Sequence, residues 1–216
     1  MMTAGPVMLG YPTGGWNRNE FMGAVLNAVS GPNSDPAIGG VISACSPLLA
    51  FNRNKLVTQF LEHSLEWLCM VDTDIVFSTD AVSRLLDSAD PIERPVISAL
   101  YFVFENGVKT PAAYLNTAKP GEDLDVRAIA ETNDKVVGRV FATGAGFLLV
   151  HRSVYETIQK DSGGDTCWFR EGVIDQRDFG EDISFCIRAG ISGFPVHVNT
   201  GVRVGHIKSA MLGEVK

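Results

Sequence analysis

Strand-like and helix-like segments alternate through the first hundred residues, and this alternation limits the possible folds more than any other feature. The run Trp67–Val71 is apolar at every position, as expected for a strand buried on both faces of a sheet. The pattern predicts an α/β fold whose mainly parallel central sheet is flanked by helices on both faces. The expected strands are Pro6–Tyr11, Val41–Cys45, Trp67–Val71 and Pro95–Phe104, and the expected helices carry apolar stripes over Phe21–Val29, Leu56–Leu65 and Val82–Leu86.

The second half of the chain has a less regular pattern, with shorter elements and longer loops. A length of 216 residues suits one domain. We therefore expect a single domain over residues 1–216, with an α/β half over 1–104 and a smaller mixed, partly antiparallel half over 105–216. The elements expected there are a strand at Phe147–Val150, a helix at Glu181–Ala189, a β-like tail at Val196–His206, and a hairpin of Ala128–Glu131 with Lys135–Phe141.

The charge balance limits the possible ligands. Lys and Arg total 18 against 25 Asp and Glu, which gives a formal net charge of −7. Wrapping nucleic acid needs clustered basic residues, so this class of partner is excluded. An anionic ligand such as a diphosphate would be repelled unless a cation lay between it and the protein.

Cysteine usage and hydropathy indicate the compartment. The four cysteines have no C-x-x-C spacing and lie in apolar stretches, so we expect buried, reduced thiols. The first residues show no signal-peptide pattern, and no segment approaches the ~20 apolar residues of a membrane span. These features predict a cytoplasmic protein without a membrane span.

Two acids, in Asp72-Thr73-Asp74, follow the buried run Trp67–Val71 directly. In an extended chain residues i and i+2 share a face, so both carboxylates are expected to point the same way. Ligands of open parallel sheets bind beyond the carboxyl ends of strands. Two oxygen ligands there suit Mg²⁺ or Mn²⁺, and the alternative is that both acids are ordinary polar residues at a strand exit.

Further candidates for a site are scattered along the chain. Glu181 and Asp182 open a helix, whose dipole favours ionised carboxylates and so a proton acceptor; simple capping would explain them equally. Arg53 opens another helix and could bridge to a phosphate or to an acid. His206 lies near the C-terminus, and Gly144-Ala145-Gly146 would permit close approach of a ligand or form a simple turn.

Taken in order, these segments resemble the GT-A glycosyltransferases, in particular the group related to family 2, over nearly the whole chain. No single segment is specific, and the resemblance depends on their order and spacing. The matching segments are Val7–Thr13, Arg53–Val57, Trp67–Asp74, Thr143–Arg152, Gly180–Cys186 and Val202–His206.

The resemblance implies how the acids act. In that group the D-x-D acids hold a divalent cation, usually Mn²⁺, on the diphosphate of a nucleotide sugar. Here Asp74 would bind the metal, Asp72 would bind the ribose or the metal, and His206 would be a further metal ligand. The Glu181-Asp182 pair would lie near the acceptor, with Asp182 as the base if the enzyme inverts the anomeric centre.

The resemblance also implies where the substrates lie. Residues 1–104 would form the nucleotide-binding half and residues 105–216 the acceptor side. Trp168 and Phe169, on the acceptor side, are candidates for stacking on a sugar. The residues implied to contact the nucleotide sugar are Tyr11, Pro12, Thr13, Arg53, Thr73, Gly144, Ala145 and Gly146.

The expected function is transfer of a sugar from a nucleoside-diphosphate sugar, with UDP favoured by the resemblance, to an acceptor hydroxyl. The cofactor would be Mn²⁺ or Mg²⁺, and the acceptor a glycan, a protein serine or threonine, or a small molecule. One alternative is a nucleotidyltransferase, although Pro12–Gly15 lacks the lysine of its usual phosphate loop. The other is a non-catalytic nucleotide-sugar-binding or virion-associated protein, against which the intact acids and His206 count.

Overall fold

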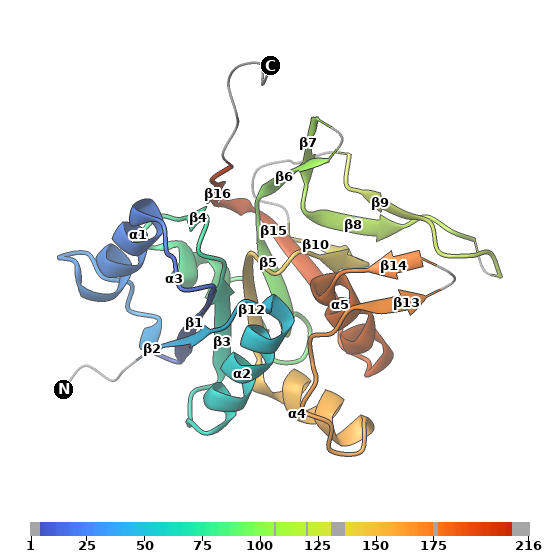
Figure 1. Cartoon of the computed structure of the whole chain (residues 1–216), viewed down its shortest axis with the longest axis horizontal. Coiled ribbons are helices and arrows are strands. Elements are labelled where there is room, and N and C mark those ends of the chain that lie inside the picture. The colour runs from blue at the N-terminus through green and yellow to red at the C-terminus, as the bar shows by residue number, and fades with distance from the viewer. Residues whose placement is uncertain (1–4, 106, 120, 131–136, 175–176, 209–216) are drawn as a thin grey trace.

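The computed structural model describes residues 5–105, 107–119, 121–130, 137–174 and 177–208. In this part of the chain, seven strands form a central sheet (Figure 1). Their order across the sheet is β10 (Val137–Val140), β15 (Val196–Arg203), β5 (Val96–Leu100), β12 (Phe147–His151), β3 (Trp67–Val71), β1 (Val7–Thr13) and β2 (Ile38–Cys45).

Strand directions in this sheet are mixed, which corrects the expectation of a mainly parallel sheet. β1 is parallel to β2 and β3, and β5 is parallel to β15. β12, however, lies between β3 and β5 and is antiparallel to both, and β10 is antiparallel to β15. The reason is that the second half of the chain inserts β12 into the middle of the sheet, between two strands of the first half.

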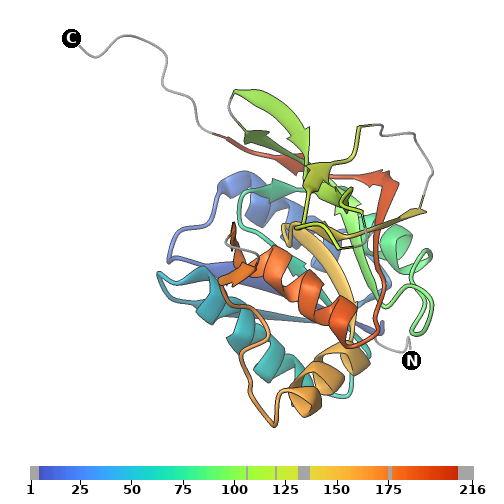
Figure 2. The ribbon, with the colours of Figure 1, turned by 90° about the vertical axis from the view of Figure 1, so that its right-hand side faces the viewer.

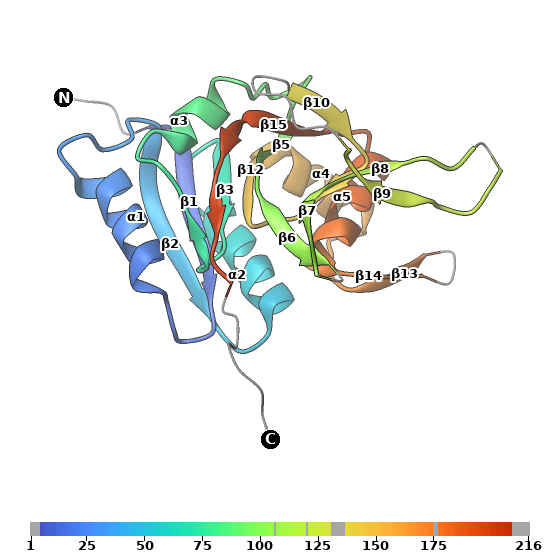
Figure 3. The same cartoon turned by 90° about the horizontal axis from the view of Figure 1, so that it is seen from above.

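Helices cover both faces of the sheet, as the alternation predicted. α1 (Asn19–Ser30) and α3 (Ala81–Leu86) pack on one face (Figure 3). α2 (Leu49–Leu61), α4 (Arg152–Asp161) and α5 (Glu181–Ile191) pack on the other (Figure 2). β3 contributes to both layers, with Leu68 and Met70 in one core and Cys69 and Val71 in the other.

In the described part of the chain, four small sheets lie outside the central sheet (Figure 1). The expected hairpin of Ala128–Glu131 with Lys135–Phe141 is not formed in the described residues, because β9 pairs with β8 and β10 pairs with β15; residues 131–136 lie outside the described part. The pairings are β11 (Ala142–Thr143) with β8 (Ala113–Asn116) and β9 (Val126–Ala128), β6 (Phe102–Glu105) with β7 (Val108–Pro111), β13 (Gly172–Ile174) with β14 (Arg177–Phe179), and β16 (Gly205–His206) with β4 (Ile75–Val76).

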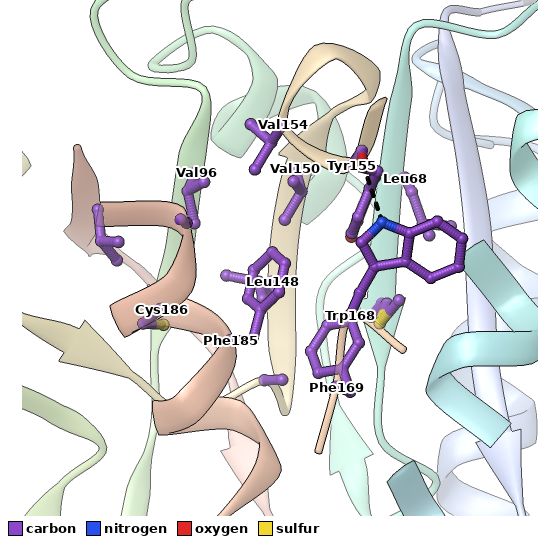
Figure 4. Packing of buried hydrophobic residues seen from close by; sticks show 14 of the residues in the cluster. Leu68, Val96, Leu148, Val150, Val154, Tyr155, Trp168, Phe169, Phe185 and Cys186 are labelled. Carbon is purple, nitrogen blue, oxygen red and sulfur yellow. Dashed lines mark hydrogen bonds between the residues drawn. The ribbon is translucent and has the colours of Figure 1, made fainter. Parts of the chain in front are cut away.

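Trp168 and Phe169 belong to the core and are not free to stack on a sugar, which corrects their expected role (Figure 4). Trp168 is 1% exposed, and its indole Nε1–H donates to the Tyr155 carbonyl oxygen at 2.8 Å. The Phe169 ring stacks on Phe185 with 4.4 Å between the ring centroids. Both aromatic residues therefore attach the loop before β13 to the layer formed by α4 and α5.

Two expectations from composition can be compared with the structure. Cys69 and Cys186 are buried as expected, whereas Cys45 is exposed and Cys167 half-buried, and all four are free thiols. Among the described residues, no helix has the length and apolar character needed to cross a membrane.

Candidate active site

The acids Asp72 and Asp74 follow the end of β3, where the chain turns. The Ile75 N–H donates to the Asp72 carbonyl oxygen at 3.0 Å, which turns the chain immediately after the strand. The rule that residues i and i+2 point the same way holds only for extended backbone, so it does not apply across this turn, and the shared direction stays a prediction. The two carboxylates reach different partners.

Arg53, on α2, holds Asp72. Its Nη2 donates to both carboxylate oxygens of Asp72, at 2.8 and 3.0 Å, and its Nη1 donates to Oε1 of Glu181 at the start of α5. The side chain is 2% exposed. Burial alone would lower the pKa of Arg53, but the charges of Asp72 and Glu181 raise it, so the guanidinium stays charged. This ion-pair network joins α2 to the end of β3 and to the start of α5.

Asp74 pairs with the His206 imidazole and the Lys208 ammonium group. Its Oδ2 lies 3.0 Å from His206 Nε2 and 3.1 Å from Lys208 Nζ. Burial raises the pKa of Asp74, but the hydrogen bonds from His206 and Lys208 outweigh it and lower the pKa to about 2. Asp74 is therefore an ionised carboxylate at neutral pH, as a metal ligand has to be.

Backbone contacts fix the orientation of the His206 ring. Its Nδ1 donates to the Phe102 carbonyl oxygen at 2.8 Å, which leaves Nε2 facing Asp74. The hydrogen bond to Asp74 raises the pKa of His206. When the ring is neutral, the hydrogen stays on Nδ1 and the Nε2 lone pair is free, which is the arrangement that metal-binding histidines show.

Glu181 and Asp182 have different roles although they are neighbours. Glu181 is bound by Arg53, and burial raises its pKa. Asp182 accepts a hydrogen bond from the Ile183 N–H on Oδ1, at 2.8 Å, and faces the cleft. In the described part of the chain, Glu181 is held by an ion pair with Arg53 and Asp182 by no ion pair, so Asp182 is the better candidate to accept a proton.

A cleft of about 500 Å³ brings most of the expected residues together. They come from the carboxyl ends of β1 and β3, from α2, from the start of α5 and from β16. The residues expected from the sequence that line it are Pro12, Thr13, Arg53, Asp72, Thr73, Asp74, Glu181, Asp182 and His206. Tyr11 is not among them, since its ring packs edge-on against Phe21 at 5.3 Å.

Gly144, Ala145 and Gly146 also do not belong to the described lining of the cleft. A Cβ built on Gly144 would overlap the Tyr101 hydroxyl, and one on Gly146 would lie 2.8 Å from Cζ of the same ring. The glycines therefore make room for a side chain of this protein. The expectation was close approach of a ligand or a simple turn, and the group that approaches these glycines in the structure is the Tyr101 side chain.

Sequence reasoning missed several lining residues, among them Tyr101, Lys208 and Asn52. Tyr101 interrupts the apolar run that was expected to be one strand, and it separates β5 from β6. Lys208 lies two residues beyond His206, a spacing that could have drawn attention to it. Asn52 directly precedes Arg53, and its amide Nδ2 donates to the carbonyl oxygens of Thr13 and Ser46 at 3.1 and 2.8 Å, which ties together the loops after β1 and β2.

The donor set fits a divalent cation in part. Among the described residues, no three His, Cys, Asp or Glu side chains converge as a metal-binding group. Asp74 and His206 do meet, and they supply one carboxylate oxygen and one imidazole nitrogen. Asp72, the third expected ligand, is occupied by Arg53. Such a pair fits a cation whose remaining ligands are phosphate oxygens and water.

No protein-family model matches the sequence, and no curated protein matches it. Among solved structures, the chain is similar to A197 from STIV, with a TM-score of 0.60 and 15% identity over 94% of this chain and 86% of A197. It is also similar to GalNAc-T7, in a crystal structure with UDP, GalNAc and Mn²⁺, with a TM-score of 0.59 and 12% identity over 94% of this chain and 44% of GalNAc-T7. The fold is glycosyltransferase-like. At these identities the likeness concerns the fold alone, and function has to be argued from the site.

Proposed function

We propose that this chain is a metal-dependent glycosyltransferase that moves a sugar from a nucleoside diphosphate, with UDP preferred, to an acceptor hydroxyl. The supporting observation is that the Asp74–His206 pair and Asp182 line one cleft of about 500 Å³. That volume lies within the range of small-molecule sites. The glycosyltransferase-like fold adds support, and GalNAc-T7 itself was crystallised with UDP and Mn²⁺.

Asp74 and His206 would hold the cation, Mn²⁺ or Mg²⁺. A mixed nitrogen and oxygen donor set favours Mn²⁺ over the more strictly oxygen-binding Mg²⁺. Bound there, the ion supplies Lewis-acid stabilisation of the charge that develops on the departing diphosphate. Asp72, with both oxygens on Arg53, would act by fixing the turn after β3 and by contacting the ribose.

Two residues of the chain would act directly on the substrates. Lys208 donates to Asp74 at 3.1 Å. On substrate binding it would donate to a diphosphate oxygen instead, because both oxygens are anionic acceptors for its ammonium group. Asp182 would accept the proton of the acceptor hydroxyl. Arg53 and Lys208 also offset part of the negative charge of the four cleft acids, Asp72, Asp74, Glu181 and Asp182.

UDP binding tests this function first. The chain has a net charge of −7, so we expect UDP to bind in calorimetry with Mn²⁺ and to bind weakly, if at all, with EDTA. A panel of nucleotide sugars assayed for Mn²⁺-dependent hydrolysis would then identify the donor. Equal UDP affinity with and without Mn²⁺ would refute the metal bridge, and binding without turnover of any donor would favour the non-catalytic alternative.

A second prediction concerns His206. His206→Ala should weaken Mn²⁺ binding by at least about tenfold, because loss of even an outer-shell partner of a metal ligand commonly costs 10–100-fold. The matched control is His63→Ala, since His63 is exposed and lies outside the cleft. Mn²⁺ titration in calorimetry and thermal unfolding should be measured on both variants. A lower Tm with unchanged Mn²⁺ affinity would make His206 a structural residue.

A further inference from the structure

Tyr101 is a buried residue of the cleft wall that has no role in the reaction proposed above. It follows β5 directly and is 5% exposed. Its ring lies edge-on to the His206 ring, with 5.5 Å between the ring centroids. Its hydroxyl lies on the side of Gly144 and Gly146, next to the Asp182 carboxylate, whose Oδ2 is 3.4 Å from the position of a Cβ on Gly144.

The position of the Tyr101 side chain depends on the space that two glycines leave for it. The Gly146 N–H donates to the hydroxyl at 3.1 Å. Side chains at either glycine would collide with the ring or its hydroxyl. The Gly144-Ala145-Gly146 sequence thus holds the Tyr101 hydroxyl in one place, which is a requirement for a preorganised hydrogen-bond donor.

The hydroxyl keeps its proton. A phenol has an ordinary pKa of about 10, so Tyr101 is protonated at neutral pH. The Gly146 amide uses one lone pair of the oxygen, and in the described part of the chain no acceptor is bonded to its hydrogen. Tyr101 therefore has a neutral O–H group available to donate within a cleft that is rich in carboxylates.

We propose that the Tyr101 hydroxyl donates a hydrogen bond to a diphosphate oxygen of the nucleotide sugar, which rests on the proposed function. The anomeric carbon of the donor sugar has to lie between the diphosphate, on the Asp74–His206 side, and the acceptor, on the Asp182 side. Tyr101 contacts His206 with its ring and approaches Asp182 with its hydroxyl, so it spans these two sides.

The chemistry of the step is balanced without a proton from Tyr101. The bond from the anomeric carbon to the diphosphate oxygen breaks, and its electron pair stays on the diphosphate. The acceptor oxygen forms the new bond, and its proton moves to Asp182. Tyr101 remains a phenol throughout, and its hydrogen bond strengthens as negative charge develops on the diphosphate.

Tyr101→Phe tests the inference, because phenylalanine keeps the ring on the two glycines and removes only the hydroxyl. With Mn²⁺ present, UDP affinity in calorimetry should fall at least about tenfold, as expected on loss of one hydrogen bond to a charged group. Donor hydrolysis and transfer should fall by a common factor. The matched control is Tyr155→Phe. The Tyr155 hydroxyl is buried in the core and has no hydrogen-bond partner among the described residues, so this variant should bind UDP like wild type.

UDP carries no sugar, so UDP affinity separates a role of Tyr101 in binding the diphosphate from a role in binding the sugar. Unchanged UDP affinity in Tyr101→Phe would overturn the inference. A lower Tm would then make Tyr101 a structural residue, and a higher KM for the donor alone would make it a sugar contact. Wild-type protein that does not bind UDP would instead refute the proposed function itself. As a check on geometry, Gly144→Ala should lower Tm more in the wild type than in the Tyr101→Phe background, where the overlapping hydroxyl is absent; an equal loss would show that Tyr101 is not seated there.

Discussion

Arg53→Met is expected to lower the free energy of unfolding by about 3 kcal/mol, the lower end of the range for breaking a buried ion pair. The methionine keeps much of the side-chain stem but leaves Asp72 and Glu181 without their cation. The lower end applies because the Asp72 and Glu181 side chains keep 26% and 14% of their surface exposed. Urea unfolding measures the loss, and Lys55→Met, an exposed position on the same helix, should change stability little.

The loss in Arg53→Met should also depend on pH. Burial raises the pKa of Glu181 and Arg53 lowers it, so removing Arg53 raises this pKa further. A carboxyl with a raised folded-state pKa contributes its stability fully below the unfolded pKa and loses it as pH rises through the folded pKa. The difference between wild type and variant should therefore be larger at pH 8 than at pH 5. An equal stability difference at pH 5 and pH 8 would mean that the loss of the Glu181 counter-charge does not cause the destabilisation.

Local sequence pattern was sufficient to predict β3. Five consecutive apolar residues followed by an acid predicted Trp67–Val71, and the structure has the same bounds with all five side chains buried. The run is short, lacks polar positions and ends where Asp72 needs solvent or a cation. Those properties depend on nearby residues alone, so they can be read from the sequence.

Strand order could not be predicted in the same way. β12 forms hydrogen bonds with β3 and β5, more than forty residues away in each case. Its apolar run shows that it is buried, but many partners would bury it equally. The place and antiparallel direction of β12 depend on its pairing with these two distant strands, for which the local pattern carries no signal.

The site shows the same division between local and non-local information. The resemblance indicated Asp74 and His206 together, and the structure brings these residues into contact although they are 132 positions apart. It did not indicate that Arg53 would bind both Asp72 and Glu181, the latter 128 positions away. Asp72 and Asp74 also have different partners, and the turn between them, in which the Ile75 N–H donates to the Asp72 carbonyl oxygen, has no signal in the side-chain pattern.

Asp182→Asn should separate the chemistry from substrate binding. Asparagine keeps the size of the side chain and can still accept the Ile183 N–H hydrogen bond that begins α5, but it cannot take a proton. Transfer should therefore fall by at least ~10²-fold, the lower end of what a positioned general base contributes. Affinities for Mn²⁺ and UDP should stay near wild type, because Asp74, His206 and Lys208 are unchanged.

Donor hydrolysis gives the discriminating comparison for Asp182. Water is a small nucleophile that does not need the acceptor site, so hydrolysis should fall less than transfer in Asp182→Asn. In Tyr101→Phe, by contrast, both rates should fall together, because the diphosphate departs in both reactions. Asp87→Asn, an exposed aspartate after α3, is the matched control. Transfer near the wild-type rate in Asp182→Asn would mean that Asp182 only caps α5, and would favour a retaining mechanism, which needs no such base.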